Sequence, residues 1–209
     1  MSAPVTYDAI VIGAGAAGLF CAATAGQRGR RVLLVDHAAE PGAKILISGG
    51  GRCNFTNLHA RPEHYLSENP HFCRSALARF GPHDFIKLVE KYGIKYHEKT
   101  LGQLFCDDSS NDIIRLLRAE CDAGDVQWKV PCAVDAITNS NGYYNVIVGM
   151  ATITCESLVI ATGGLTVPKI GASPFGYKIA EQFGLRIVAP RPALVPLSFA
   201  PEMLEQFGD

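Results

Sequence analysis

The chain has 209 residues, of which 48% are hydrophobic and 19% charged, with a formal net charge of -1. The apolar fraction is sufficient for a packed core and excludes a disordered chain. The near-neutral charge gives no electrostatic reason to expect nucleic acid or a membrane as a partner. The 21 glycines follow no collagen period but gather in clusters around residues 13–18, 49–51 and 163–164. Such clusters are typical of backbone that approaches something closely.

The cysteines and the N-terminal segment indicate the cellular compartment in which the protein is expected. The seven cysteines form no C-x-x-C pair, and no His/Cys group has the spacing of zinc ligands. We therefore expect reduced thiols, a cytoplasmic location and no metal site. Residues 9–25 are apolar, but Asp8 precedes them and no basic residue lies upstream. A strand, a glycine turn and a helix explain this segment better than a signal peptide or a membrane span.

The first part of the chain predicts one βαβ unit. Residues 7–12 form an apolar run typical of a strand covered on both faces, and residues 16–27 form a helix rich in small residues. Residues 31–36 form a second buried strand. Residues 40–57 then predict a long loop with several glycines and no clear helix or strand.

The rest of the chain predicts a mixture of short elements. Helices are expected at 70–80, 82–92, 110–119 and 174–184. Short strands are expected at 94–97, 103–106 and 185–188, and an apolar strand at 158–161. Antiparallel strands are expected at 126–137, 143–148 and 151–154, with a tight turn at the N-S-N-G sequence of 139–142.

The sequence G-A-G-A-A-G at 13–18 fits the dinucleotide-binding pattern G-x-G-x-x-G in the context that supports it, between a buried strand and a helix. Gly13 makes the tight turn, Gly15 lets a pyrophosphate reach the backbone, and Gly18 allows close helix–strand packing. Ala16 and Ala17 supply N–H groups at the helix N-terminus, where the dipole favours an anion.

Two further features select among dinucleotides. Asp36 ends the second strand, where a carboxylate accepts hydrogen bonds from ribose hydroxyls and repels a 2′-phosphate, which favours FAD or NAD over NADP. The second feature is the strand-end turn Ala161-Thr162-Gly163-Gly164, which follows an antiparallel meander. It resembles the second FAD signature of two-dinucleotide flavoproteins, so FAD is favoured over NAD.

Residues 42–57 read G-A-K-I-L-I-S-G-G-G-R-C-N-F-T-N. With the two turns above, I-G-A-S-P-F-G-Y at 170–177 and A-L-V-P-L at 193–197, they resemble the BaiN/YhiN family of FAD-dependent oxidoreductases, aminoacetone-oxidase-like flavoproteins. The resemblance extends over essentially the whole chain. It implies a glutathione-reductase-like α/β fold, an FAD/NAD(P)-binding Rossmann domain whose parallel sheet has a β-meander crossover.

The resemblance also implies a domain organisation. Residues 1–189 would form the N-terminal part of the FAD domain, and residues 190–209 would begin the crossing into a substrate domain outside this chain. Val134 matches a position, on a strand just before the meander, whose backbone contacts the adenine.

The glycine loop at 48–51 has a physical role beside a flavin. Consecutive N–H groups of Ser48, Gly49, Gly50 and Gly51 can lie against the isoalloxazine edge and stabilise negative charge at N1 and C2=O. Positive charge can come from Lys44 or Arg52, and hydrogen bonds from Asn54 and Thr56.

Cys53 is a weak catalytic candidate, as a redox thiol or a nucleophile. No second cysteine lies within fifteen residues, and a buried packing role beside the flavin is favoured. The sequence identifies no general acid or base.

The leading hypothesis is an FAD-dependent oxidoreductase that takes hydride from NAD(P)H and passes it to a small-molecule substrate. The flavin would carry out the redox chemistry, while the protein positions it. One alternative is a NAD-dependent dehydrogenase without flavin, and another is an inactive FAD-binding fragment or module. The sequence does not specify the oligomeric state.

Overall fold

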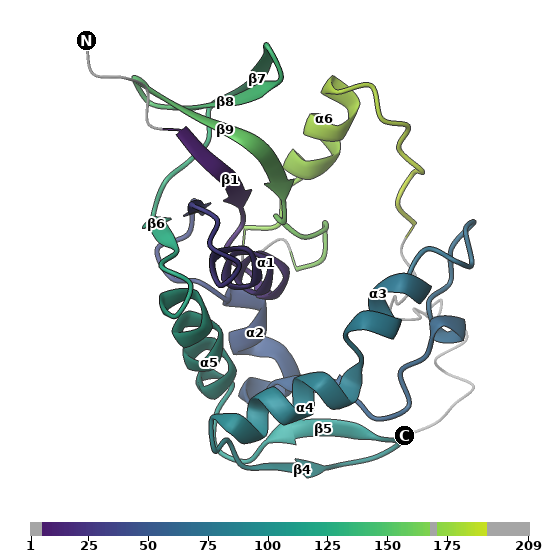
Figure 1. The fold of residues 1–209 in the computed structure, drawn as a ribbon. Coiled ribbons are helices and arrows are strands. Elements are labelled where there is room, and N and C mark those ends of the chain that lie inside the picture. Colours follow the sequence, from purple (N-terminus) through teal and green to yellow (C-terminus); the bar gives the residue numbers. More distant parts are fainter. Residues whose placement is uncertain (1–5, 168–170, 192–209) are drawn as a thin grey trace, which may run out of the picture. The chain divides into compact units, whose positions relative to one another are not determined.

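A computed structural model describes residues 6–167 and 171–191. Contacts divide the chain into two units, residues 1–176 and residues 177–209. The first unit contains the sheets and the predicted cofactor turns, and its architecture is shown in Figure 1. The predicted domain crossing at 190–209 lies almost wholly outside the described residues.

The predicted βαβ unit is present. Strand β1 (Thr6–Ile12) leads into helix α1 (Ala16–Gly26), and strand β2 (Val32–Val35) returns parallel to β1 with Ile10 opposite Leu33. All four residues of β2 are buried. Runs of apolar residues form such strands because helices or loops cover both faces of the sheet.

The main sheet has six strands in the order β6-β2-β1-β9-β8-β7. Strands β6 (Gln127–Lys129) and β9 (Ala151–Ile160) lie parallel to β2 and β1, respectively. Strands β7 (Ala136–Ser140) and β8 (Tyr143–Val148) complete an antiparallel meander with β9. The structure therefore confirms a Rossmann-type FAD/NAD(P)-binding α/β fold, with the meander joined to the parallel sheet.

Three of the predicted strands were wrong in extent. The single strand predicted at 126–137 is two strands, because β6 pairs with β2 on one side of the sheet whereas β7 pairs with β8 on the other. The strands predicted at 151–154 and 158–161 are parts of one long strand, β9, which ends at Ile160. Its two halves meet different partners: Ala151 to Cys155 pair with β8, and Thr154 to Ile160 pair with β1.

Helix α5 (Asn111–Asp122) packs beside α1, as Figure 1 shows. Its apolar residues Ile113, Ile114, Leu116 and Leu117 are all buried. Their spacing places them on one face of the helix. The core of the unit lies between this face, α1 and the parallel strands.

A second sheet has three antiparallel strands in the order β3 (Asn54–Asn57), β5 (Gln103–Cys106) and β4 (Tyr96–Glu98). Helix α4 (Pro82–Lys91) packs against β3. Phe55 of β3 contacts the ring of Phe85 in α4, with 6.0 Å between ring centroids. These contacts hold the second sheet to the helices.

The prediction of a loop without helix or strand at 40–57 was wrong. The segment contains helix α2 (Ala43–Ile47), the 3-10 turn η1 (Ser48–Gly51) and strand β3. Helix α2 is only five residues long, too short to show a hydrophobic period in the sequence.

Three further elements complete the described structure. The 3-10 turn η2 (Pro62–His64) was not predicted. Helix α3 (Arg74–Arg79) covers part of the predicted helix at 70–80, and α6 (Phe175–Gln182) matches the predicted C-terminal helix. Residues 185–188 form no strand. Within the described ranges, no helix has the length and apolarity needed to cross a membrane.

Candidate functional site

Two of the glycines in the first turn are required by the protein's own packing. A Cβ atom on Gly18 would lie 1.7 Å from the carbonyl oxygen of Gly13. A Cβ atom on Gly13, whose φ is +110°, would lie 2.5 Å from the carbonyl oxygen of Ala161. Helix α1, the end of β1 and the end of β9 therefore meet at van der Waals contact, as predicted for Gly18.

Gly15 differs from these two glycines. A Cβ atom there would have no heavy atom within 4 Å, and the backbone angles of Gly15 (φ -83°, ψ -173°) suit any residue. Nothing in the protein thus requires a glycine at this position. A group that approaches the backbone from outside would require one.

The N-terminus of α1 offers donors to such a group. Ala16 and Ala17 are exposed, and no side chain caps the helix. The first N–H groups of a helix have no partner within the helix, and the dipole favours a negative charge beside them. The open space at Gly15 and the uncapped N-terminus therefore fit a dinucleotide pyrophosphate.

Asp36 lies directly after β2, at the edge of the sheet where β1 ends in the glycine turn. Its Oδ2 accepts a hydrogen bond from the Ala14 N–H at 2.5 Å, and its Oδ1 accepts one from the Ala38 N–H at 2.8 Å. Each carboxylate oxygen has two lone pairs, so ribose hydroxyls can add to these bonds. The Ala14 contact was not expected from the sequence, and it ties Asp36 to the glycine turn.

The second turn lies against the first, as predicted. The Ala161 N–H donates to the Ile12 carbonyl at 2.8 Å, which brings Ala161 to Gly164 beside Gly13. Lys44 of α2 reaches this turn, with its Nζ 2.9 Å from Thr166 Oγ1 and 3.3 Å from the Gly164 carbonyl oxygen. The structure thus brings Lys44 to the second turn; its predicted role toward flavin or pyrophosphate remains a prediction.

Helix α2 connects the first turn to the 48–51 loop. The Gly42 N–H donates to the Ala14 carbonyl at 2.9 Å, so α2 begins at the first turn. Five helical residues then carry the chain about 8 Å further. Gly49, Gly50 and Gly51 all have positive φ, at 58°, 66° and 87°. A left-handed run of this kind favours glycine at each position.

The other side of the loop is fixed by α5 and β5. The Ser110 N–H donates to the Gly51 carbonyl at 2.8 Å, and Ser110 Oγ donates to the Leu46 carbonyl at 3.0 Å. The sequence indicates Ser110 only as a possible helix cap. In the structure this residue, 2% exposed, links α5 to the loop instead.

The remaining loop residues lie at the start of β3. Arg52 and Asn54 are exposed, and Thr56 is half-buried opposite Leu104. The Asn54 amide nitrogen can donate to the Thr56 and Leu104 carbonyls at 3.1 and 3.2 Å. The structure therefore places these side chains beside the glycine loop, while their contacts with a flavin remain predictions.

Cys53 is 5% exposed and sits in the core with a φ of +50°. Burial raises the pKa of its thiol, although a hydrogen bond with Ser48 opposes part of this rise. A buried thiol with a raised pKa is a poor nucleophile. This environment favours the packing role over the catalytic one.

Val134 is not on a strand. It is half-buried in the connection between β6 and β7, so its expected placement on a strand before the meander was wrong. The Cys132 N–H two residues earlier donates to the Asp36 carbonyl at 2.6 Å. The connection therefore still passes the end of β2, and an adenine contact by Val134 remains a prediction.

No group of three or more His, Cys, Asp or Glu side chains with the geometry of a metal site occurs among residues 6–167 and 171–191. The described site offers backbone N–H groups, the Asp36 carboxylate, the Lys44 amine and the side chains at the start of β3.

Comparison with known proteins places these features in context. Residues 7–192 match the family model "HI0933-like protein Rossmann domain". A ribosomal RNA dihydrouridine synthase of Escherichia coli is 58% identical over 200 residues, which are 96% of this chain and 50% of that protein. A 3-dehydro-bile acid delta(4,6)-reductase of Clostridium scindens is 26% identical over 190 residues, 90% of this chain and 46% of that protein.

Among solved structures, glycine oxidase from Geobacillus kaustophilus superposes with a TM-score of 0.55 at 13% identity, covering 87% of this chain and 59% of that one. This likeness concerns the fold. The chain spans about half the length of the curated relatives it matches.

Proposed function

Because the chain belongs to the HI0933-like family of Rossmann-domain proteins, we propose that it supplies the FAD-binding half of an oxidoreductase that reduces a carbon–carbon double bond conjugated to a carbonyl. The open space at Gly15 is the observation that carries the cofactor assignment, because no protein atom lies within 4 Å of a Cβ atom there and the backbone is open to an external group. When bound, FAD supplies two-electron redox chemistry, accepting hydride from NAD(P)H and delivering it to the acceptor.

The protein's own residues position the cofactor. The N–H groups at the start of α1 bind the pyrophosphate, and Asp36 accepts hydrogen bonds from the adenosine ribose. The N–H groups of Gly49, Gly50 and Gly51 would face the N1 and C2=O edge of the isoalloxazine ring, since the Ser48 N–H already donates to the Ile45 carbonyl. The second turn, Ala161–Gly164, flanks the pyrophosphate on its inner side.

The acceptor we propose is a uridine of ribosomal RNA. Dihydrouridine differs from uridine by two hydrogens across C5=C6, and this bond is conjugated to the C4 carbonyl. The bile acid reductase named above acts, by its name, on a related unsaturated ketone. The 58% identity to a ribosomal RNA dihydrouridine synthase favours the nucleic-acid substrate over a small molecule. The expectation of no nucleic-acid partner depended on the charge of the whole chain, which says nothing about local clusters.

The test uses the full-length protein with its bound flavin. Anaerobic addition of NADH or NADPH should bleach the visible flavin absorbance, and incubation with protein-free ribosomal RNA should then raise the mass of a uridine by two hydrogens. A colourless full-length protein would refute the cofactor assignment. A flavoprotein that reduces a steroid enone and leaves ribosomal RNA unchanged would refute the RNA assignment.

A further inference from the structure

Residues 59–80 form an unusual surface, which we call the η2–α3 surface. Helix α3 has no buried residue, and η2 has none either. Leu66 is 94% exposed and Phe72 81% exposed, and Tyr65 is half exposed. Tyr65 and Leu66 line one pocket, and an exposed apolar patch rimmed by polar residues is a feature of binding sites.

Hydrogen bonds and a ring contact order the η2–α3 surface. His64 and Tyr65 N–H groups donate to the carbonyls of Arg61 and Pro62, at 3.0 and 3.1 Å. Phe80, at the end of α3, contacts the ring of Phe20 in α1, with 4.8 Å between ring centroids. Local hydrogen bonds and this aromatic contact therefore hold the segment in place while leaving its rings exposed.

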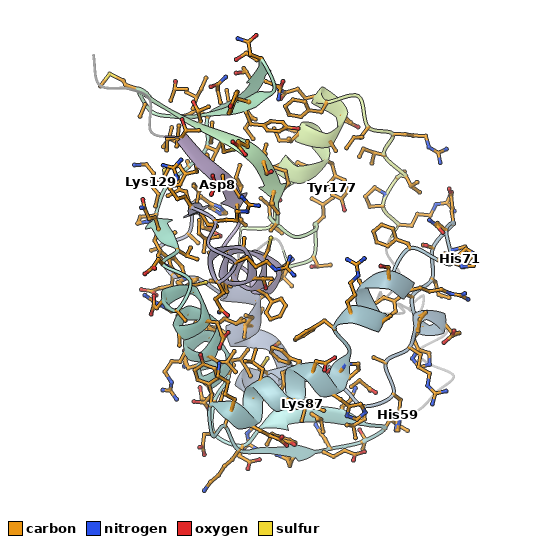
Figure 2. All side chains as sticks on the ribbon, in the orientation of Figure 1. Asp8, His59, His71, Lys87, Lys129 and Tyr177 are labelled. Atoms are coloured by element: carbon orange, nitrogen blue, oxygen red, sulfur yellow. The ribbon has the colours of Figure 1, made fainter. Side chains whose placement is uncertain are left out.

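The charge of the surface is positive. With histidine counted as neutral, residues 59–80 have three arginines against two glutamates, a net charge of +1, whereas the whole chain has a net charge of -1. The arginines are Arg61, Arg74 and Arg79, all exposed. Figure 2 shows His59 and His71 on this part of the chain, at its outer side.

A pocket of about 220 Å³ lies within the surface, lined by Pro62, Glu63, Tyr65, Leu66, Pro70 and Arg74, among others. Sites for drug-sized ligands occupy about 300–1,000 Å³, so this pocket is smaller than such a site. Tyr65 offers a ring for stacking, Arg74 a positive charge for a phosphate, and Glu63 an acceptor for the N–H of a base.

We propose that the η2–α3 surface binds unpaired nucleotides of the RNA substrate, with Tyr65 and Phe72 stacking on bases and Arg61 and Arg74 contacting phosphates. Exposed aromatic rings among basic side chains are the usual means of binding single-stranded RNA. This inference rests on the proposed reduction of ribosomal RNA. It adds the part of the molecule that holds the RNA while the flavin site acts on one uridine.

The experiment measures the binding of a fluorescein-labelled single-stranded oligouridine to the full-length flavoprotein by anisotropy at several salt concentrations. The test variants are Phe72→Ala and Arg74→Gln. Their matched controls are Met150→Ala, which removes another fully exposed apolar side chain, and Arg30→Gln, which removes an exposed arginine from the connection between α1 and β2. The flavin content of every variant is measured in parallel.

We expect Phe72→Ala to weaken binding about tenfold through lost stacking. Arg74→Gln should also weaken binding and lower the salt slope by about 0.7, the value for one phosphate contact to a single strand. The control variants should bind like the wild type, and all variants should keep their flavin.

Three results would overturn the inference. One is unchanged RNA binding by both test variants. Another is a yellow wild-type protein that does not bind the oligouridine, which leaves the cofactor assignment intact. The third is a loss of bound flavin or of folding stability in the test variants and not in the controls. That result would show that another part of the protein covers this surface. A colourless wild-type protein would instead refute the proposed function itself.

Discussion

The carbonyl oxygen of Gly13 lies 1.7 Å from the position that a Cβ atom of Gly18 would occupy. Backbone therefore packs directly on backbone where α1 crosses the end of β1. We predict that Gly18→Ala destabilises the domain by about 3 kcal/mol, at the upper end of overpacking effects, because a rigid carbonyl cannot move aside. Urea unfolding of the domain measures this loss, and a Gly18→Ala protein as stable as the wild type would contradict the close packing.

Asp36 should matter for stability as well as for cofactor binding. Its carboxylate accepts the N–H groups of Ala14 and Ala38, so Asp36→Ala leaves two backbone donors without this acceptor. We expect a loss of about 1–3 kcal/mol in unfolding free energy, together with weaker FAD binding. Asp36→Asn keeps an acceptor oxygen and should lose less. FAD titration and urea unfolding of the three proteins provide the comparison, and equal behaviour of all three would count against the assigned role.

Cys53 should be chemically inert in the folded protein. It is 5% exposed, and burial raises the pKa of its thiol. We predict slow maleimide labelling of Cys53 at neutral pH, compared with the half-buried Cys132, as followed by peptide mass spectrometry. We also predict that Cys53→Ser full-length protein keeps its turnover. Loss of turnover with normal flavin content would restore the catalytic role of Cys53.

Glu120 supplies a pH-dependent part of the stability. Burial alone would raise its pKa, but hydrogen bonds from Lys91, Gln27 and Tyr92 and the charge of Lys91 lower the pKa to about 2. Since the folded pKa is below the ordinary 4.5, this contribution is present above pH 4.5 and is lost as the pH falls toward 2.

We therefore predict that Glu120→Gln costs about 1–3 kcal/mol at pH 7 and flattens the acid side of the stability curve. The matched control is Glu156→Gln, at an exposed carboxylate, which should leave the curve unchanged. Urea unfolding at several pH values between 2 and 7 makes the comparison. Parallel curves for the wild type and Glu120→Gln would refute the role of this network.

Long periodic elements could be predicted from the sequence, and short ones could not. The inward face of α5 is a clear 3.6-residue pattern, and β1 and β2 are uninterrupted apolar runs. By contrast, β6 has three residues, and its place beside β2 depends on the register of Leu34 with Trp128. A strand of three residues is too short to show a periodic pattern of apolar residues, so its partner in the sheet cannot be predicted from the sequence.

The candidate site shows the same division. The motif at 13–18 specifies the turn because Gly13 and Gly18 are required by the close packing of a helix on the strand that precedes it, whereas Gly15 faces open space. The bond from the Ala14 N–H to Asp36, and the reach of Lys44 to Thr166, join residues distant in the chain. Such contacts form only when the chain has folded, so no local sequence pattern predicts them.

Gly15→Ala tests the central claim most directly, because a methyl group there meets no protein atom and enters only the space assigned to the pyrophosphate. The measurement is FAD titration of full-length wild type and Gly15→Ala apoproteins, with urea unfolding of both in the absence of FAD. We predict unfolding free energies that agree within about 1 kcal/mol, since only the residue before the helix changes, and FAD affinity reduced at least about tenfold. Equal FAD affinity in the two proteins would contradict the assignment.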